Sequence, residues 1–130
     1  MKKIITIILI TAIFFQCGSF CVHGDNENRL NAIEKNFDLK TCREFTVEAG
    51  RPDTITEEKL TVLKNSPVDR ISINPQTFND SVLEKVGRRH SAEDTIRIFK
   101  LARKIGFDNI NMDLIAGLPT DTLDGFKLSL

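Results

Sequence analysis

The sequence predicts an α/β fold in which three parallel strands with intervening helices form a partial (β/α) barrel. Three segments alternate apolar and polar residues, as strands with one buried face do, and helical patterns separate them. Each polar face persists to the carboxyl end of its strand, the edge at which parallel α/β folds bind ligands. We therefore expect a ligand-lined crevice there. Three antiparallel strands with a solvated face are the alternative.

The composition of the whole chain is that of globular material. The 130 residues are 41% hydrophobic and 28% charged, which suits one domain but is short for a complete α/β enzyme. Lys plus Arg and Asp plus Glu both number 18, so no excess of positive charge indicates a nucleic-acid partner.

The amino terminus differs from the rest of the chain. Lys2 and Lys3 precede an apolar run that is typical of a secretory signal peptide and short for a membrane span. We interpret residues 1–24 as signal-peptide-like, with a cut ahead of Asp25; a short membrane anchor and an artefactual start are the alternatives. Residues 25–32 are polar and are predicted to be a linker, and residues 33–130 are predicted to be the partial barrel.

The cysteines and histidines predict no metal site. Cys17 and Cys21 have C-x3-C spacing, but residue 24 is glycine where a third thiolate of a cluster loop is needed. Cys42 is too far along the chain to belong to that loop. The two histidines, His23 and His90, are isolated from other metal-ligating residues.

The first predicted strand covers residues 44–48 and carries Glu48 on its polar face. A Gly-Arg-Pro loop follows it, and Thr56 is predicted to cap the next helix. The second strand lies within residues 68–79. Ile71 and Ile73 are expected on its apolar face, with Ser72, Asn74 and Gln76 on its polar face.

Two helices are predicted between the second and third strands. Asn79 is the cap of the first. Ser91 and Asp94 form a capping box for the second, which Gly106 ends. The third strand is predicted over residues 109–114, with Asp113 on its polar face, and another helix begins near residue 122.

Three long segments resemble one known family, in order: EFTVEAGRPDTITEEKL, RISINPQTFNDSVLEKVGRRHSAED and GFDNINMDLIAGLPTDT. They are similar to the oxygen-independent coproporphyrinogen III oxidases, or coproporphyrinogen dehydrogenases, of the radical SAM superfamily, to which haem chaperones are related. The resemblance runs from about residue 33 to the end. It implies the middle of a radical SAM barrel, with S-adenosylmethionine (SAM) and a 4Fe-4S cluster as cofactors and a porphyrinogen or haem-like molecule as ligand.

The resemblance also implies which residues contact SAM, namely Glu48, Gln76, Arg88 and Asp113. Their chemistry suits this ligand. Carboxylates accept hydrogen bonds from its ammonium group and ribose hydroxyls, and arginine clamps its carboxylate. Arg89 and His90 are interpreted as surface residues.

The departures from the family predict an inactive chain. The three-cysteine cluster loop, the tyrosine before it and the glycine-rich turn after the next strand are absent. Our leading hypothesis is a fragment that keeps part of the SAM site and has no catalytic or metal-ligating residue of its own. The alternatives are an exported or non-catalytic binding remnant and a half-enzyme that needs the missing upstream part. The resemblance implies a cytoplasmic location, and the signal-like segment implies export.

Overall fold

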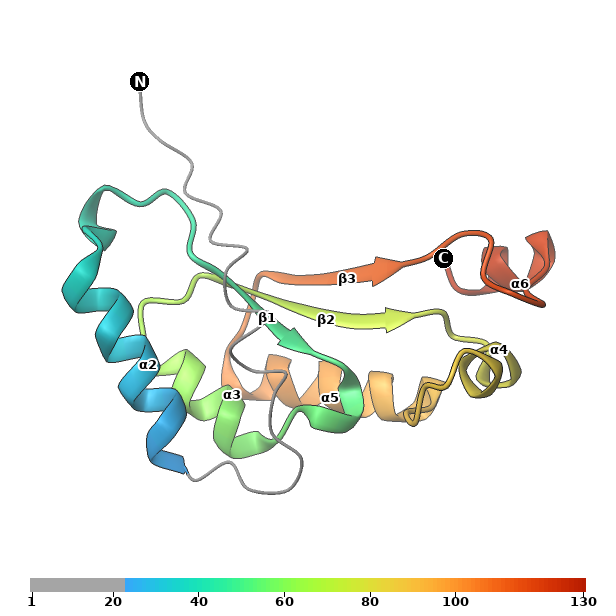
Figure 1. Cartoon of the computed structure of the whole chain (residues 1–130), viewed down its shortest axis with the longest axis horizontal. Coiled ribbons are helices and arrows are strands. Elements are labelled where there is room, and N and C mark those ends of the chain that lie inside the picture. Colours follow the sequence, from blue (N-terminus) through green and yellow to red (C-terminus); the bar gives the residue numbers. More distant parts are fainter. Residues whose placement is uncertain (1–22) are drawn as a thin grey trace.

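The computed structural model describes residues 23–130, which form a three-stranded sheet with helices (Figure 1). The predicted segment 1–24, with Cys17 and Cys21, lies outside the described residues except for its last two. The elements follow in the order α2 (His23–Asn36), the 3-10 helix η2 (Leu39–Thr41), β1 (Thr46–Gly50), the 3-10 helix η3 (Pro52–Thr54), α3 (Glu57–Lys64), β2 (Arg70–Gln76), α4 (Asp80–Lys85), α5 (Ala92–Ile105), β3 (Ile110–Leu114) and α6 (Leu123–Leu128).

The strands are parallel and stand in the order β1-β2-β3, which confirms the predicted fold class and excludes the antiparallel alternative. The register places Glu48 opposite Ser72, and Ser72 opposite Asn111. Polar residues of all three strands therefore lie in one row across the sheet.

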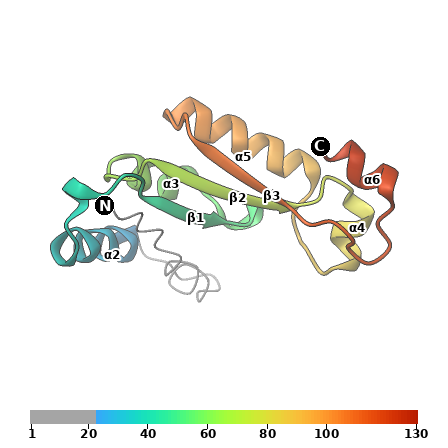
Figure 2. The ribbon, with the colours of Figure 1, turned by 90° about the horizontal axis from the view of Figure 1, so that it is seen from above.

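The apolar face of the sheet forms the core. Helices α3 and α5 lie along this face (Figure 1). The buried cluster joins residues in or just before β1 and β2 to residues in or just after α3 and α5: Phe45, Val47, Ile71, Ile73, Leu60, Leu63, Ile98, Ala102 and Phe107. Each fully buried Val, Leu, Ile or Phe side chain among them contributes about 1.5–3 kcal/mol relative to exposure. The view from above (Figure 2) looks onto the other face, which no described helix covers.

Short polar side chains begin the helices as the sequence predicts. The Thr56 hydroxyl accepts a hydrogen bond from the Lys59 amide at 3.3 Å, and Asn79 caps α4. Ser91 and Asp94 complete a reciprocal capping box at the start of α5. These caps satisfy backbone N–H groups that a helix cannot pair within itself.

Two boundaries differ from the prediction. Residues 25–32, expected to be a linker, lie within α2, and Leu30 of this helix is buried in the core. A single anchored apolar stripe is enough to hold a polar segment in a helix. Strand β1 is shifted by two residues, because the Phe45 amide donates to the Asp69 carboxylate at 2.9 Å and Gly50 pairs with Ile73 across a bulge.

Candidate functional site

The polar face of the sheet carries a continuous chain of hydrogen bonds from β1 to β3. The Asn74 amide donates to Glu48 Oε2 at 2.8 Å, and the Ser72 hydroxyl lies 3.2 Å from Asn74 Oδ1. The Asn111 amide donates to Ser72 Oγ at 3.0 Å and to Asp113 Oδ1 at 2.6 Å. The structure thus joins two of the predicted site residues, Glu48 and Asp113, through three side chains.

The direction of these hydrogen bonds constrains the chemistry. Asn111 gives one amide hydrogen to each arm, and Ser72 passes its own hydrogen on to Asn74. Both arms therefore end on a carboxylate that accepts, which leaves the second oxygen of Glu48 and of Asp113 for a ligand. Ser72 is buried, so water competes little for the hydrogen bonds that this hydroxyl makes.

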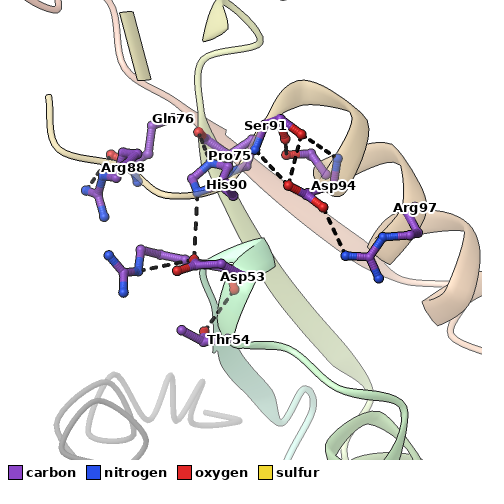
Figure 3. Close-up of polar contacts among 11 residues, drawn as sticks. Asp53, Thr54, Pro75, Gln76, Arg88, His90, Ser91, Asp94 and Arg97 are labelled. Carbon is purple, nitrogen blue, oxygen red and sulfur yellow. Dashed lines mark hydrogen bonds and ion pairs between the residues drawn. The ribbon is translucent and has the colours of Figure 1, made fainter. Parts of the chain in front are cut away.

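The other two predicted residues form a second pair at the end of β2. Gln76 has a left-handed backbone, with φ of 72°. Its Oε1 accepts a hydrogen bond from Arg88 Nη2 at 3.3 Å. Figure 3 shows the two side chains next to one another. One residue of β2, Pro75, separates Gln76 from Asn74, so both groups belong to the carboxyl end of the same strand.

His90 is buried, so its interpretation as a surface residue is wrong. Its residue exposure is 3%, whereas Arg89 is exposed as expected. The imidazole Nε2 lies 3.0 Å from the Pro75 carbonyl, and Nδ1 lies 3.8 Å from the Asp53 carboxylate (Figure 3). Packing between the loops that follow β1 and α4 buries this ring.

At the amino end of the same face, charge is neutralised locally. Thr46 donates to Glu44 at 2.9 Å, and Arg70 lies 3.2 Å from the same oxygen. The Thr46 hydrogen bond, followed by that of Arg70, lowers the pKa of Glu44. The Glu44 carboxylate is therefore already paired with Thr46 and Arg70.

The residues of the polar face suit SAM. It presents an ammonium group and ribose hydroxyls, which donate to carboxylate oxygens, and a carboxylate, which accepts from a guanidinium. Glu48 and Asp113 each have a free carboxylate oxygen, and Arg88 has a guanidinium held at the same strand end.

The described residues do not fit a 4Fe-4S cluster. Among residues 23–130, no three side chains of the His, Cys, Asp or Glu types are grouped as metal ligands. The Cys42 thiol donates to the Glu44 carbonyl at 3.2 Å and precedes β1, at the opposite end of the sheet from Gln76. We therefore assign no cluster ligand in this part of the chain.

The amino end of the sheet also carries an open groove of about 610 Å³. This groove is separate from the hydrogen-bonded side chains that run from Glu48 to Asp113. It is lined by residues 34–40 and Pro67. None of the four predicted site residues lines it. Within residues 23–130, no helix has the length and apolarity needed to cross a membrane.

The chain matches known proteins along most of its length. Residues 4–130 match the sequence profile of the Radical SAM superfamily, and this range includes most of the signal-like segment. Over 93 residues the chain is 56% identical to the Bacillus subtilis oxygen-independent coproporphyrinogen-III oxidase-like protein HemZ, covering 72% of this chain and 19% of that protein. Over 87 residues it is 48% identical to the Bacillus subtilis heme chaperone HemW, covering 67% of this chain and 23% of that protein.

A solved structure has the same arrangement of strands and helices. It is coproporphyrinogen III oxidase (HemN) from Escherichia coli, described as a radical SAM enzyme, with a TM-score of 0.72 and 28% identity. The match covers 84% of this chain and 25% of that one. The chain therefore spans a quarter or less of the length of these three relatives.

Proposed function

Because this chain belongs to the radical SAM superfamily, we propose that it is the SAM-binding middle of a coproporphyrinogen dehydrogenase-type enzyme. The residues proposed to contact SAM are Glu48, Gln76, Arg88 and Asp113. The observation that carries this proposal is the hydrogen-bond chain that ends on Glu48 at one side and on Asp113 at the other.

The spacing of the two carboxylates suits an extended ligand. Glu48 is level with Asn111 of β3, and Asp113 lies two residues further along that strand. With adjacent strands 4.7–4.9 Å apart and a rise of about 3.3 Å per residue, the Cα atoms of Glu48 and Asp113 are about 12 Å apart. Glu48 would receive the ammonium group of SAM, and Asp113 would receive its ribose hydroxyls. Arg88, held by Gln76, would pair with the SAM carboxylate.

SAM supplies 5′-deoxyadenosyl radical chemistry in this superfamily. The proposed role of this protein chain is to bind and orient SAM. We propose that the chain does not cleave SAM by itself, since its sequence has no C-x3-C-x2-C loop. Anaerobic reconstitution with iron and sulfide tests this proposal. We expect no SAM cleavage, and four iron atoms per chain together with 5′-deoxyadenosine release would overturn it.

Binding is tested with the 130-residue chain itself, ¹⁵N-labelled and titrated with SAM in an NMR spectrometer. We expect amide shifts concentrated in β1, β2 and β3. Glu48→Gln and Asp113→Asn should each weaken binding about tenfold, because each removes a charge-assisted hydrogen bond. Glu57→Gln and Asp124→Asn are matched exposed controls. A wild-type spectrum that SAM leaves unchanged contradicts the proposed site.

The parent enzyme's ligand is proposed to be a porphyrinogen, with haem as the second candidate. Haem is favoured by the identity to HemW, a protein named as a heme chaperone. Titration of the chain with haemin, followed by its Soret absorption, distinguishes the two. A saturable spectral shift supports a chaperone-type role, and a linear response that matches free haemin opposes it.

The place of the chain in the cell and in its enzyme is also a proposal. We propose a cytoplasmic fragment of such an enzyme. The alternatives are an exported binding remnant and a half-enzyme that needs a partner chain carrying the cluster loop. A C-x3-C-x2-C sequence in the adjacent upstream nucleotides supports the half-enzyme. A mature chain that begins at Asp25 in the extracellular fraction supports export instead.

A further inference from the structure

The segment between α4 and α5 is hydrogen-bonded to two adjacent residues at the end of β2, Pro75 and Gln76. Arg88 donates to the side chain of Gln76, and His90 lies against the carbonyl of Pro75. The next residue, Ser91, begins α5 through its capping box. Gln76 is therefore next to an anchored residue, Pro75, and Arg88 lies two residues before another, His90.

The buried imidazole has a defined role in this arrangement. A carbonyl oxygen accepts hydrogen bonds and donates none, so His90 Nε2 carries the hydrogen toward Pro75 at 3.0 Å. The His90 side chain has 0% exposure, and its Nδ1 has no hydrogen-bond partner and faces Asp53 at 3.8 Å. Figure 3 shows the ring between the end of β2 and the loop that follows β1.

The two contacts differ in strength. The Arg88–Gln76 hydrogen bond is long, at 3.3 Å, and both side chains are half-buried, so by itself it holds the guanidinium weakly. The His90–Pro75 hydrogen bond is shorter and is shielded from water. Gln76 follows Pro75 directly and has φ of 72°, a backbone conformation that persists where its surroundings support it.

We propose that His90 is a positioning residue that holds Arg88 where it pairs with the carboxylate of the bound ligand. The ring fixes the backbone of residues 88–91 against Pro75, and Arg88 reaches the site from that fixed backbone. This inference rests on the proposed SAM site. It adds that affinity for the amino-acid part of SAM depends on a residue that does not touch SAM.

Two ligands separate positioning from general stability. SAM carries the amino-acid carboxylate, and 5′-methylthioadenosine has the same nucleoside without it. His90→Leu should weaken SAM binding about tenfold and change binding of 5′-methylthioadenosine less than about twofold. His90→Gln, whose amide can also donate to the carbonyl, should stay within about threefold of wild type for both ligands. Arg88→Met is the benchmark and should resemble His90→Leu.

Each outcome has a defined meaning. If wild type binds neither ligand, the proposed function falls and this inference falls with it. If Arg88→Met loses SAM while His90→Leu keeps it, the inference is wrong and the proposed function stands. Equal loss of both ligands by a folded His90→Leu also overturns positioning, since that is the result of a purely structural role.

A measurement on the wild-type ring keeps the proposal testable if His90→Leu does not fold. Long-range ¹⁵N–¹H spectra should show His90 protonated at Nε2. That resonance should shift on addition of SAM and stay in place on addition of 5′-methylthioadenosine. A ring protonated at Nδ1, or a resonance that SAM does not move, contradicts the proposal.

Discussion

Asn111 is the residue that makes the polar face one unit. Its amide serves Ser72 on the neighbouring strand and Asp113 on its own. An amide that donates in two directions fixes two acceptors with one rotamer, so the orientations of Glu48 and Asp113 are coupled through the sheet. A pair of carboxylates held in this way is preorganised for a donor-rich ligand.

Asn74 is the residue on which the Glu48 arm depends. Asn74→Ala removes the 2.8 Å hydrogen bond to Glu48 and leaves that carboxylate without its anchor. We expect SAM binding to weaken about tenfold, or about 1.4 kcal/mol, near the lower end for loss of one hydrogen bond to a charged group. The NMR titration measures this, with Asn109→Ala as an exposed asparagine control next to β3. Equal SAM affinities of Asn74→Ala and Asn109→Ala would show that the hydrogen bond from Asn74 does not orient Glu48 for the ligand.

Asp94 makes the stability of the chain depend on acid. Hydrogen bonds from the Ser91 backbone amide, from Arg97 and from the Ser91 hydroxyl lower the pKa of Asp94 from 3.8 to about 2. Because the folded pKa is the lower one, this stabilisation is complete above about pH 4 and is lost as the pH falls through 2. The Asp94 side chain is 37% exposed, so we discount its contribution to about 1 kcal/mol.

The Asp94 prediction is measured in two ways. Carboxyl ¹³C titration should give an apparent pKa near 2 for this residue. Asp94→Asn should lower the melting temperature at pH 6 by several degrees and by progressively less toward pH 2. Glu93→Gln removes an exposed acid from the same helical turn and is the control. A pH-independent difference between Asp94→Asn and wild type would contradict the linkage.

Alternation of residue types was sufficient to predict that Glu48 and Asp113 share a face, because side-chain direction in a strand has a period of two. Alternation was not sufficient to predict the row of hydrogen bonds that joins these two carboxylates. That row depends on the strand register, which sets Glu48 opposite Ser72. The burial of His90 was missed for a similar reason. It arises from contacts with Pro75 and Asp53, which are distant in sequence.

At the scale of elements, local signals located the helices well. Caps at Thr56, Asn79 and Ser91 act within three residues of their helix, so sequence alone reports them. Two boundaries depended on packing instead. The burial of Leu30 extends α2 into the predicted linker, and the Phe45–Asp69 contact sets the start of β1.

The end of α5 depends on a glycine. Gly106 has φ of 108°, and a Cβ there would lie 3.3 Å from Lys64 Cε. Gly106→Ala should therefore destabilise the chain by about 1–2 kcal/mol, from backbone strain and from displacement of Lys64, which donates to the Gly106 carbonyl at 2.6 Å. Gly87→Ala is the matched control, since φ is 71° there and nothing lies within 4 Å of the added Cβ.

Thermal unfolding followed by circular dichroism measures both glycine variants. Gly87→Ala carries backbone strain without the steric term, so it should lower the melting temperature less than Gly106→Ala does. Gly106→Asn should recover part of the loss, because asparagine adopts the left-handed region more readily than alanine. Equal melting temperatures for Gly106→Ala and wild type would show that this turn tolerates a side chain.

At the scale of the molecule, the two faces of the sheet differ in how far helices cover them. Helices α3 and α5 cover the apolar face, and no described helix covers the polar one (Figure 2). Within the described residues, β1 and β3 each pair on one side, so the sheet has two open edges. Large apolar side chains are also exposed around α6, namely Leu123, Leu128 and Leu130, at 72%, 88% and 84%.

Open edges and exposed leucines together predict self-association of the chain. Unpaired strand edges accept further strands, and clustered apolar side chains add to the driving force. We expect concentration-dependent oligomers in sedimentation velocity, with broad thermal unfolding. The double variant Leu123→Lys with Leu128→Glu should shift the distribution toward monomer, because it replaces apolar surface with charge at positions that contribute little to the core. Ile96→Glu alters a 46% exposed side chain on α5 and should leave association unchanged. A wild-type chain that stays monomeric with a sharp melt would mean that the described elements close their own edges.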